Sequence, residues 1–243
     1  MSEAGRRKMY INNDICYEER RAINQNLTFD TLEKEMKERG MEFCTAQMQD
    51  LHMIDSDGLY TNLALLLSEE CAHTIKVAVF QGKDGALFRN RKEFSGSLMK
   101  QLNDTCAFLD LCNGTEATFS GLRRTDRRDY PENALREALL NSIIHRDYLF
   151  SGSTIINVFD DRIEFVSLGG LERGVSMESV MMGVSQSRNP NLQRVFYLLN
   201  LVENNGTGIR KIIGLYSDTG RQPEFRSAEG GFRTTLYNLN EEV

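Results

Sequence analysis

The chain has 243 residues, of which 40% are hydrophobic and 26% charged, a composition typical of a globular protein with a packed core. Its formal net charge of −6 argues against a main surface that binds nucleic-acid phosphates, because such a surface needs an excess of Lys and Arg. The longest apolar runs are far too short to cross a bilayer, and the N-terminus lacks the apolar core of a signal peptide. We therefore expect a cytoplasmic protein without a membrane partner.

The predicted elements of the first third of the chain are mainly helical. The polar segment 17–40 has helical periodicity and ends at Gly40, and two short helices are expected at 46–54 and 59–68. Polar and β-branched residues alternate over 73–81, which predicts a strand. This region therefore has few strand signals of its own.

The middle of the chain predicts a helix at 96–112 and a strand at 116–122. The five cysteines are odd in number and include no CxxC pair, so we expect reduced thiols in the core and no disulfide framework. Two short basic clusters are interpreted as solvated segments, because short charge runs usually serve solubility. They are Arg6-Arg7-Lys8 near the start and the arginines Arg123, Arg124, Arg127 and Arg128 in the middle.

The second half begins with a long helix pattern at 131–146 that opens on a proline. Its end carries His145, Arg146 and Asp147, which we interpret as helix-terminal charges stabilised by the macrodipole, with Asp147 as their partner. The remaining predicted elements are strands at 154–159, 162–166 and 232–239 and short helices at 177–182, 191–199 and 209–216. Helices and strands that follow one another without regular alternation predict an α+β sandwich with a mixed sheet.

Glu137 and Asn141 lie four residues apart on the predicted helix 131–146, so their side chains project from one face. A carboxylate can take a proton from water aimed at a phosphoryl group, and an amide oxygen can hold a magnesium ion that bridges phosphates. By itself this spacing is common on exposed helix faces.

Two glycine clusters follow on the same half of the chain. Gly169-Gly170 comes directly after a predicted strand, and Gly206-Thr207-Gly208 directly precedes a predicted helix, where backbone N–H groups and the helix dipole favour phosphate. Each cluster taken singly is equally consistent with a turn that needs positive φ.

The order of these features resembles the GHKL ATPases. More closely, four segments are similar to the family named putative ATP-dependent DNA helicase RecG C-terminal domain: YPENALREALLNSIIHRDY, DDRIEFVSLGGL, RNPNLQRVFYLLNLVENNGTGIRKI and EGGFRTTL. The resemblance covers roughly residues 91–243. It implies a GHKL-like two-layer α/β sandwich with a mixed sheet, preceded by a smaller, mostly helical region at 1–90.

The resemblance makes Glu137 the candidate general base and Asn141 the magnesium-binding amide. It places Gly169 and Gly170 at the first nucleotide-facing turn and assigns the phosphate-side loop to Gly206, Thr207 and Gly208. Ser167 stands where GHKL ATPases have the aspartate that binds the adenine amine. The implied cofactors are ATP and Mg²⁺, and Ser167 weakens the expectation of adenine specificity.

The family usually follows a Schlafen/AlbA-type DNA-binding domain, and residues 8–11 resemble the last strand of such a domain. The resemblance thus implies the ATP-binding part of a DNA-binding transcriptional regulator, with DNA contacted through a domain mostly absent from this chain. It leaves open whether ATP is hydrolysed and whether the chain forms a homo-oligomer. The chain has no G-x-x-x-x-G-K-[ST] loop, so we do not expect a helicase motor.

Two other hypotheses stay open. The chain could keep the fold as a scaffold or dimerisation module without nucleotide chemistry, which Ser167 favours. It could also bind DNA directly through Arg123, Arg124, Arg127 and Arg128, which the acidic net charge disfavours.

Overall fold

The computed structural model describes residues 16–203 and 206–241. The basic cluster Arg6-Arg7-Lys8 and the predicted strand at 8–11 lie outside the described residues. Of the helices in the described residues, none is both long and apolar enough to cross a membrane.

One mixed sheet forms the centre of the molecule. Its strand order is β2-β1-β5-β6-β8-β7, with β1 parallel to β5 and every other neighbouring pair antiparallel. The strands are β1 (Ile75–Gln81), β2 (Leu87–Phe94), β5 (Thr154–Val158), β6 (Arg162–Leu168), β7 (Glu224–Ala228) and β8 (Gly231–Tyr237).

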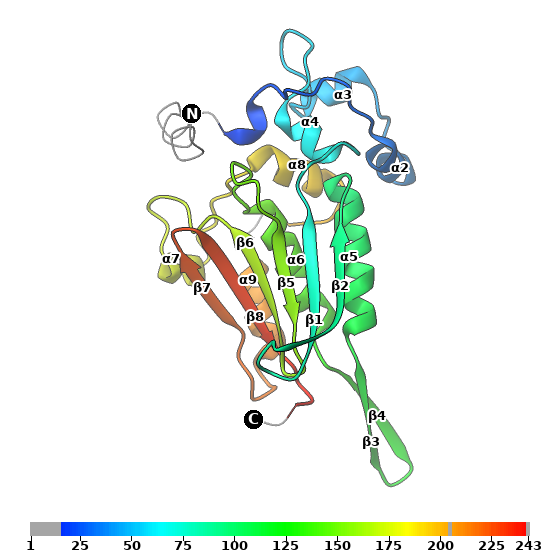
Figure 1. The fold of residues 1–243 in the computed structure, drawn as a ribbon, viewed down its shortest axis with the longest axis vertical. Coiled ribbons are helices and arrows are strands. Elements are labelled where there is room, and N and C mark those ends of the chain that lie inside the picture. The colour runs from blue at the N-terminus through cyan, green and yellow to red at the C-terminus, as the bar shows by residue number, and fades with distance from the viewer. Residues whose placement is uncertain (1–15, 204–205, 242–243) are drawn as a thin grey trace.

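Helices α5 (Leu98–Cys112), α6 (Glu132–Ile144) and α9 (Gly208–Tyr216) cover one face of this sheet (Figure 1). Residues of β6 alternate between buried and half-buried, as expected for a strand with one face packed on helices. The buried face of β6 meets α6, whose apolar residues are almost completely removed from solvent. The predicted α+β sandwich with a mixed sheet is therefore confirmed.

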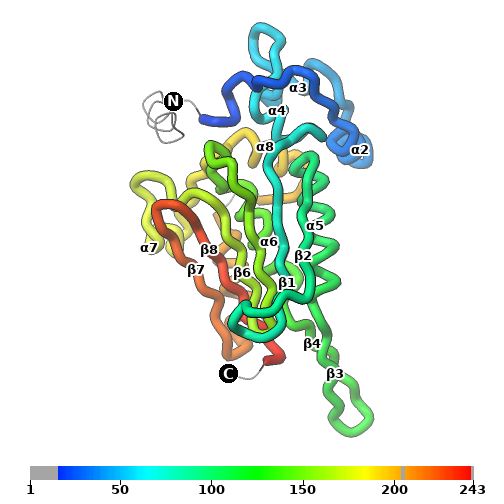
Figure 2. The backbone as a smooth tube through the Cα atoms, in the orientation of Figure 1, coloured from blue at the N-terminus to red at the C-terminus, as the bar shows by residue number. Residues whose placement is uncertain are grey.

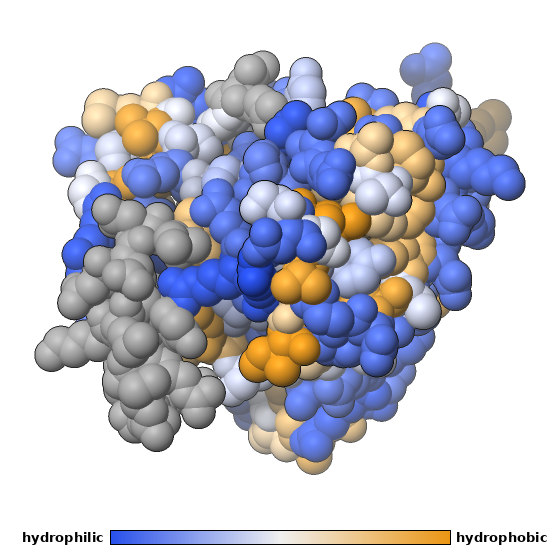
Figure 3. Space-filling view, turned by 90° about the horizontal axis from the view of Figure 1, so that it is seen from above, coloured by the Kyte–Doolittle hydropathy of each residue, from blue (hydrophilic) through white to orange (hydrophobic). Residues whose placement is uncertain are grey.

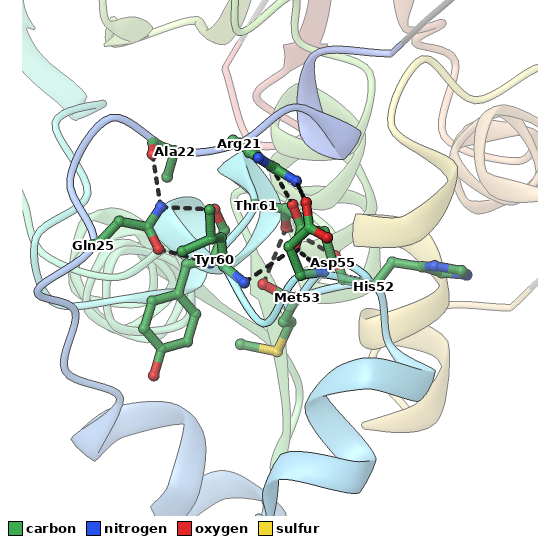
Figure 4. Close-up of polar contacts among 10 residues, drawn as sticks. Arg21, Ala22, Gln25, His52, Met53, Asp55, Tyr60 and Thr61 are labelled. Carbon is green, nitrogen blue, oxygen red and sulfur yellow. Dashed lines mark hydrogen bonds and ion pairs between the residues drawn. The ribbon is translucent and has the colours of Figure 1, made fainter.

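A smaller, mainly helical region lies at one end of the sheet and includes α2 (Asp30–Glu38), α3 (Thr45–Asp50) and α4 (Asn62–Leu67). Polar contacts fasten its loops, as Figure 4 shows: Gln25 donates to two carbonyls and accepts from the Tyr60 N–H, and Arg21 pairs with Asp55. Seen from above, this end is mostly hydrophilic with small apolar patches (Figure 3). The expected helical N-terminal region is thus present.

A two-stranded ribbon of β3 (Thr115–Ser120) and β4 (Arg123–Arg128) projects from the other end of the molecule (Figures 1 and 2). The arginine cluster expected to be a solvated loop therefore forms a strand. RRTDRR has no alternation of apolar residues, since neither face of the ribbon packs on a core, and periodicity could not reveal it.

Other differences from the expected elements have related causes. Residues 20–29 are largely non-helical, so only α2 and a short 3-10 turn η1 (Tyr17–Glu19) remain of the helix predicted at 17–40. Edge strands β2 and β7 were not predicted, because their side chains are mostly exposed or half-buried and show little apolar alternation.

The cysteines are free, but only Cys71 is buried and Cys106 is exposed. The expectation that all five lie in the core is wrong.

The predicted division between 1–90 and 91–243 stays a prediction. Strand β1 precedes residue 91 and pairs along its length with β5, and β2 crosses that position. Both strands therefore belong to the same sheet as the second half of the chain.

Glu18 connects the start of the described chain to α8 (Pro190–Leu198). It is fully buried, and its carboxylate accepts the backbone N–H groups of Asn191 at 2.6 Å and Leu192 at 2.9 Å. These are unpaired donors of the first helical turn, so Glu18 caps a helix from a distant part of the sequence. Burial raises the pKa of Glu18 to about 7, against the effect of the two hydrogen bonds.

This raised pKa predicts a pH-dependent stability. In the unfolded chain Glu18 has a pKa near 4.5. Folding therefore takes up a proton between pH 4.5 and 7, and the free energy of unfolding falls as pH rises through this window, by about 3 kcal/mol in total. Glu18→Gln keeps an acceptor for α8 but cannot titrate, so it should lose this contribution.

Urea unfolding of wild type and Glu18→Gln across this pH window measures the effect, with the exposed neighbour variant Glu19→Gln as the matched control. We expect the Glu18→Gln protein to gain stability relative to wild type as pH rises, and Glu19→Gln to follow wild type. Parallel pH profiles for all three proteins would contradict the assignment.

Candidate functional site

A cavity of about 1170 Å³, including its open mouth, lies between α6, the end of β6 and the start of α9. All the site residues expected from the sequence line it. They are Glu137, Asn141, Ser167, Gly169, Gly170, Gly206, Thr207 and Gly208. Residues from three separate parts of the sequence thus meet in one place.

Glu137 and Asn141 face the cavity because α6 buries its other side. Leu135, Leu139 and Ser142 on that side are almost completely removed from solvent. Glu137 keeps 16% of its side chain exposed, and one carboxylate oxygen lies 3.3 Å from the guanidinium of Arg136. The acid is therefore reachable from the cavity while a neighbouring cation balances its charge.

Gly208, the first residue of α9, approaches this pair closely. A Cβ atom at this position would lie 3.0 Å from a Glu137 carboxylate oxygen and 3.1 Å from the Asn141 amide nitrogen. A side chain would crowd both groups, which gives a packing reason for glycine here. The N-terminus of α9 consequently faces the acid and the amide directly.

Ser167 and the Gly169-Gly170 turn also line the cavity. Ser167 is buried on the same face of β6 as Phe165, which points toward α6. Gly169 has φ +89°, and its N–H donates to the carbonyl of Gly230 at 3.0 Å. The backbone of Gly170 runs so close to Ala228 that a Cβ would overlap its carbonyl oxygen. Both glycines are therefore required by conformation or space.

Arg188 holds this turn in place, a role that the sequence interpretation missed. Its guanidinium donates to the Gly170 carbonyl at 3.1 Å, pairs with Glu172, and lies 3.5 Å from a carboxylate oxygen of Asp147. It also packs over Gly169, at the place where a Cβ would stand. Only the string RNP, whose proline is the first residue of α8, marked this residue in the sequence.

The end of α6 differs from expectation. Burial and the nearby Arg188 lower the pKa of His145 to about 4, so it is neutral at pH 7 and is not a cation stabilised by the macrodipole. Arg146 is buried and donates to the carbonyls of Phe150 and Gly152. In place of the expected pairing with Asp147, Arg146 therefore binds the loop that follows α6, and Asp147 faces Arg188.

Lys211 brings a cation to the loop at Gly206–Gly208. It lines the cavity on the first turn of α9, and its ammonium lies 2.7 Å from a carboxylate oxygen of Glu203. The hydrogen bond from Lys211 lowers the pKa of Glu203 below its usual range. This pair was not predicted, and its only signal was a lysine three residues after Gly208.

Within residues 16–203 and 206–241, no group of three or more His, Cys, Asp or Glu side chains is placed to hold a metal ion. His73 lies in a partly buried aromatic group with Tyr17 and Tyr148, and burial lowers its pKa to about 4.

Residues 152–236 match the family model described as "Putative ATP-dependent DNA helicase recG C-terminal". This match confirms the resemblance for the segment that contains Ser167, both glycine clusters and β8. It does not extend to α6, which carries Glu137 and Asn141.

A solved structure, that of the DIP2311 protein from Corynebacterium diphtheriae, has a similar fold, with a TM-score of 0.79 at 20% sequence identity. The alignment covers 97% of this chain and 50% of that protein, so the chain spans about half the length of this structural relative. At this identity the likeness concerns the fold alone. A search of curated proteins gives no match.

The clamp formed by Arg188 predicts a local effect on backbone opening. Arg188→Met should raise amide hydrogen exchange at residues 169–172 by about 10-fold or more, because a charged hydrogen bond to the turn contributes about 1.5 kcal/mol or more. Exposed Arg173, on the same loop, provides the control Arg173→Met. Equal exchange in the two variants would show that Arg188 does not hold the turn.

Proposed function

We propose that this chain binds a nucleoside triphosphate, ATP, in the cavity, with the phosphates at Gly206–Gly208 and the base near Ser167. The observation that carries the proposal is the close approach of Gly208 to Glu137 and Asn141. It brings the N-terminus of α9 next to a carboxylate and an amide. Backbone N–H groups and the dipole of α9 favour the phosphates there. The family description of residues 152–236 supports the choice of ATP.

The residues present fit a magnesium–nucleotide complex. The amide oxygen of Asn141 would hold the ion jointly with phosphate oxygens, and when bound the ion neutralises phosphate charge. Lys211 can exchange its contact with Glu203 for a phosphate, since Glu203 and the cavity both lie within reach of its flexible side chain.

Hydrolysis would rest on Glu137. Its carboxylate would take the proton of a water whose oxygen bonds to the terminal phosphorus, as the bond from that phosphorus to the bridging oxygen breaks. The products are ADP and inorganic phosphate. Arg136 lies 3.3 Å from the carboxylate and balances its charge.

A second candidate function is a scaffold or dimerisation module without nucleotide chemistry. One observation favours it: a serine at position 167 stands where GHKL ATPases have the carboxylate that binds adenine. A hydroxyl offers a neutral hydrogen bond in place of a charged one, so adenine would be held more weakly.

We further propose that the chain is the nucleotide-sensing part of a longer DNA-associated regulator and not a motor. The half-length coverage of its structural relative is consistent with additional protein beyond this chain. Nucleotide that orders the walls of the cavity would then bias the state of the attached part.

Thermal unfolding with and without magnesium–ATP tests nucleotide binding. At a ligand concentration about 100 times Kd, binding stabilises the folded state by about 2.7 kcal/mol and should raise the midpoint by about 5–10 °C. Asn141→Ala should lose this shift, whereas Glu137→Gln should keep it and lose phosphate release. Absence of any shift at millimolar ATP would leave the scaffold as the better account.

Gly208→Ala should weaken nucleotide binding, because the added methyl group meets Glu137 and Asn141. Gly214→Ala is the matched control on the same helix, since no atom lies within 4 Å of its Cβ position. The control should keep the ATP-dependent shift and gain about 0.5–1 kcal/mol of stability from better helix propensity. Equal ATP-dependent shifts of the unfolding midpoint in both variants would show that the nucleotide does not contact the N-terminus of α9.

A further inference from the structure

The ribbon of β3 and β4, called here the arm (residues 115–128), has no function in the nucleotide proposal. Every residue of β3 is exposed, and so is every residue of β4 except the half-buried Arg128. Two-stranded ribbons without a packed face are only marginally stable in water. An arm of this kind gains stability when a partner covers it.

The base of the arm is firmly attached. Asn113 donates to the Tyr130 carbonyl at 3.0 Å and accepts the Tyr130 N–H at 2.9 Å, so one side chain ties the entering and leaving chains together. Asn240 also donates to the carbonyl of Arg127 and to the carboxylate of Asp129. These bonds hold the arm in a fixed direction away from the body.

The tip is a two-residue loop of Gly121 and Leu122, with Gly121 at φ +62°. Glycine at the first position of such a loop is typical of the type II′ hairpin turn, which matches the twist of the strands. The ribbon is therefore a regular hairpin and presents two defined faces.

The arm is basic in an acidic protein. Its four arginines outweigh Glu116 and Asp126, which gives the arm a charge of +2, whereas the whole chain carries −6 and the remainder therefore −8. An anionic polymer would be repelled by the body and attracted only by the arm.

The arginines divide between the two faces. On one face Arg124 pairs with Asp126, and Arg128 pairs with Asp110 and Glu132. On the other, Arg123 and Arg127 have no ion-pair partner among the residues that the structure describes, although Arg127 lies opposite Glu116. The hydroxyls of Ser120, Thr118 and Thr125 share that face, because directly opposed residues point to the same side. We call it the Arg123 face.

We propose that the Arg123 face binds the phosphate backbone of duplex nucleic acid. Guanidinium groups match phosphate geometry, and hydroxyls add neutral hydrogen bonds to phosphate oxygens. A two-stranded ribbon fits the B-form major groove, which is about 12 Å wide. Arg123 and Arg127 lie four residues apart on one strand, roughly 13 Å, so they reach different phosphates.

A second copy of the chain fits the arm less well. The large apolar side chains exposed on it are Phe119 and Leu122, and Phe119 lies on the opposite face from Arg123. Two such side chains offer far less surface than the roughly 800 Å² per partner of a stable protein interface.

The test measures binding of the full chain to a labelled duplex of about 20 base pairs by fluorescence anisotropy, in salt from about 50 to 200 mM. It uses no nucleotide, so its outcome is independent of the cavity. Arg123→Ala with Arg127→Ala should weaken binding at least 10-fold at low salt. It should also make the slope of log affinity against log salt shallower by about 2, one unit for each lost phosphate contact.

The matched control is Lys34→Ala with Lys76→Ala, which makes the same change of net charge at exposed side chains on other elements. It should leave the slope unchanged, and both double variants should keep the wild-type unfolding midpoint. An absence of duplex binding by wild type at low salt, or an equal loss in both double variants, would overturn the proposal. So would sedimentation that shows a dimer dissociated only by the arm substitutions, since a second copy would then be the occupant.

Discussion

The arrangement of the site depends on helix α6, which must bury its apolar residues and also present Glu137 and Asn141 to the cavity. Its alanines and leucines are buried against the sheet and the neighbouring helices, which fixes the rotation of the helix about its axis. Glu137 and Asn141 are then forced to the cavity side, one turn apart. A change in the apolar face of α6 would therefore move the acid and the amide, even though it touches neither.

The walls of the cavity are held by polar contacts whose partners are distant in sequence. Arg188 fixes the Gly169-Gly170 turn, and Asn189 donates to the carbonyls of Ile144 and Arg146 at the end of α6. Glu18 caps the helix that begins directly after these two residues. One short segment, 188–192, thus connects Glu18, the end of α6 and the Gly169-Gly170 turn.

The sequence predicted those parts of the fold that bury one apolar face. β1, β5, β6 and α5 agree with their apolar periodicity to within a few residues. Strands β2, β4 and β7 were missed because exposed edge strands need no such periodicity. Glu137, Asn141 and the glycines were found because their chemistry or backbone demands a particular residue type. Arg188 and Lys211 were not, since an arginine or a lysine in a helical or loop segment is compatible with a solvated surface.

The same reasoning explains why the arginine cluster of β4 is predicted as a solvated loop. Charge runs signal solubility when their side chains are free in water, and Arg124 and Arg128 meet that description only in part, because each is already paired with a carboxylate. Arg123 and Arg127 share one face because alternate residues of a strand point to the same side, and the register of the ribbon places the hydroxyls of β3 beside them. Register depends on where the turn lies, and Gly121 sets the turn. A one-residue change of register would place Ala117 and Phe119 on the face of Arg123 and Arg127 in place of Thr118 and Ser120, so the polar character of the Arg123 face follows from the turn as much as from the arginines themselves.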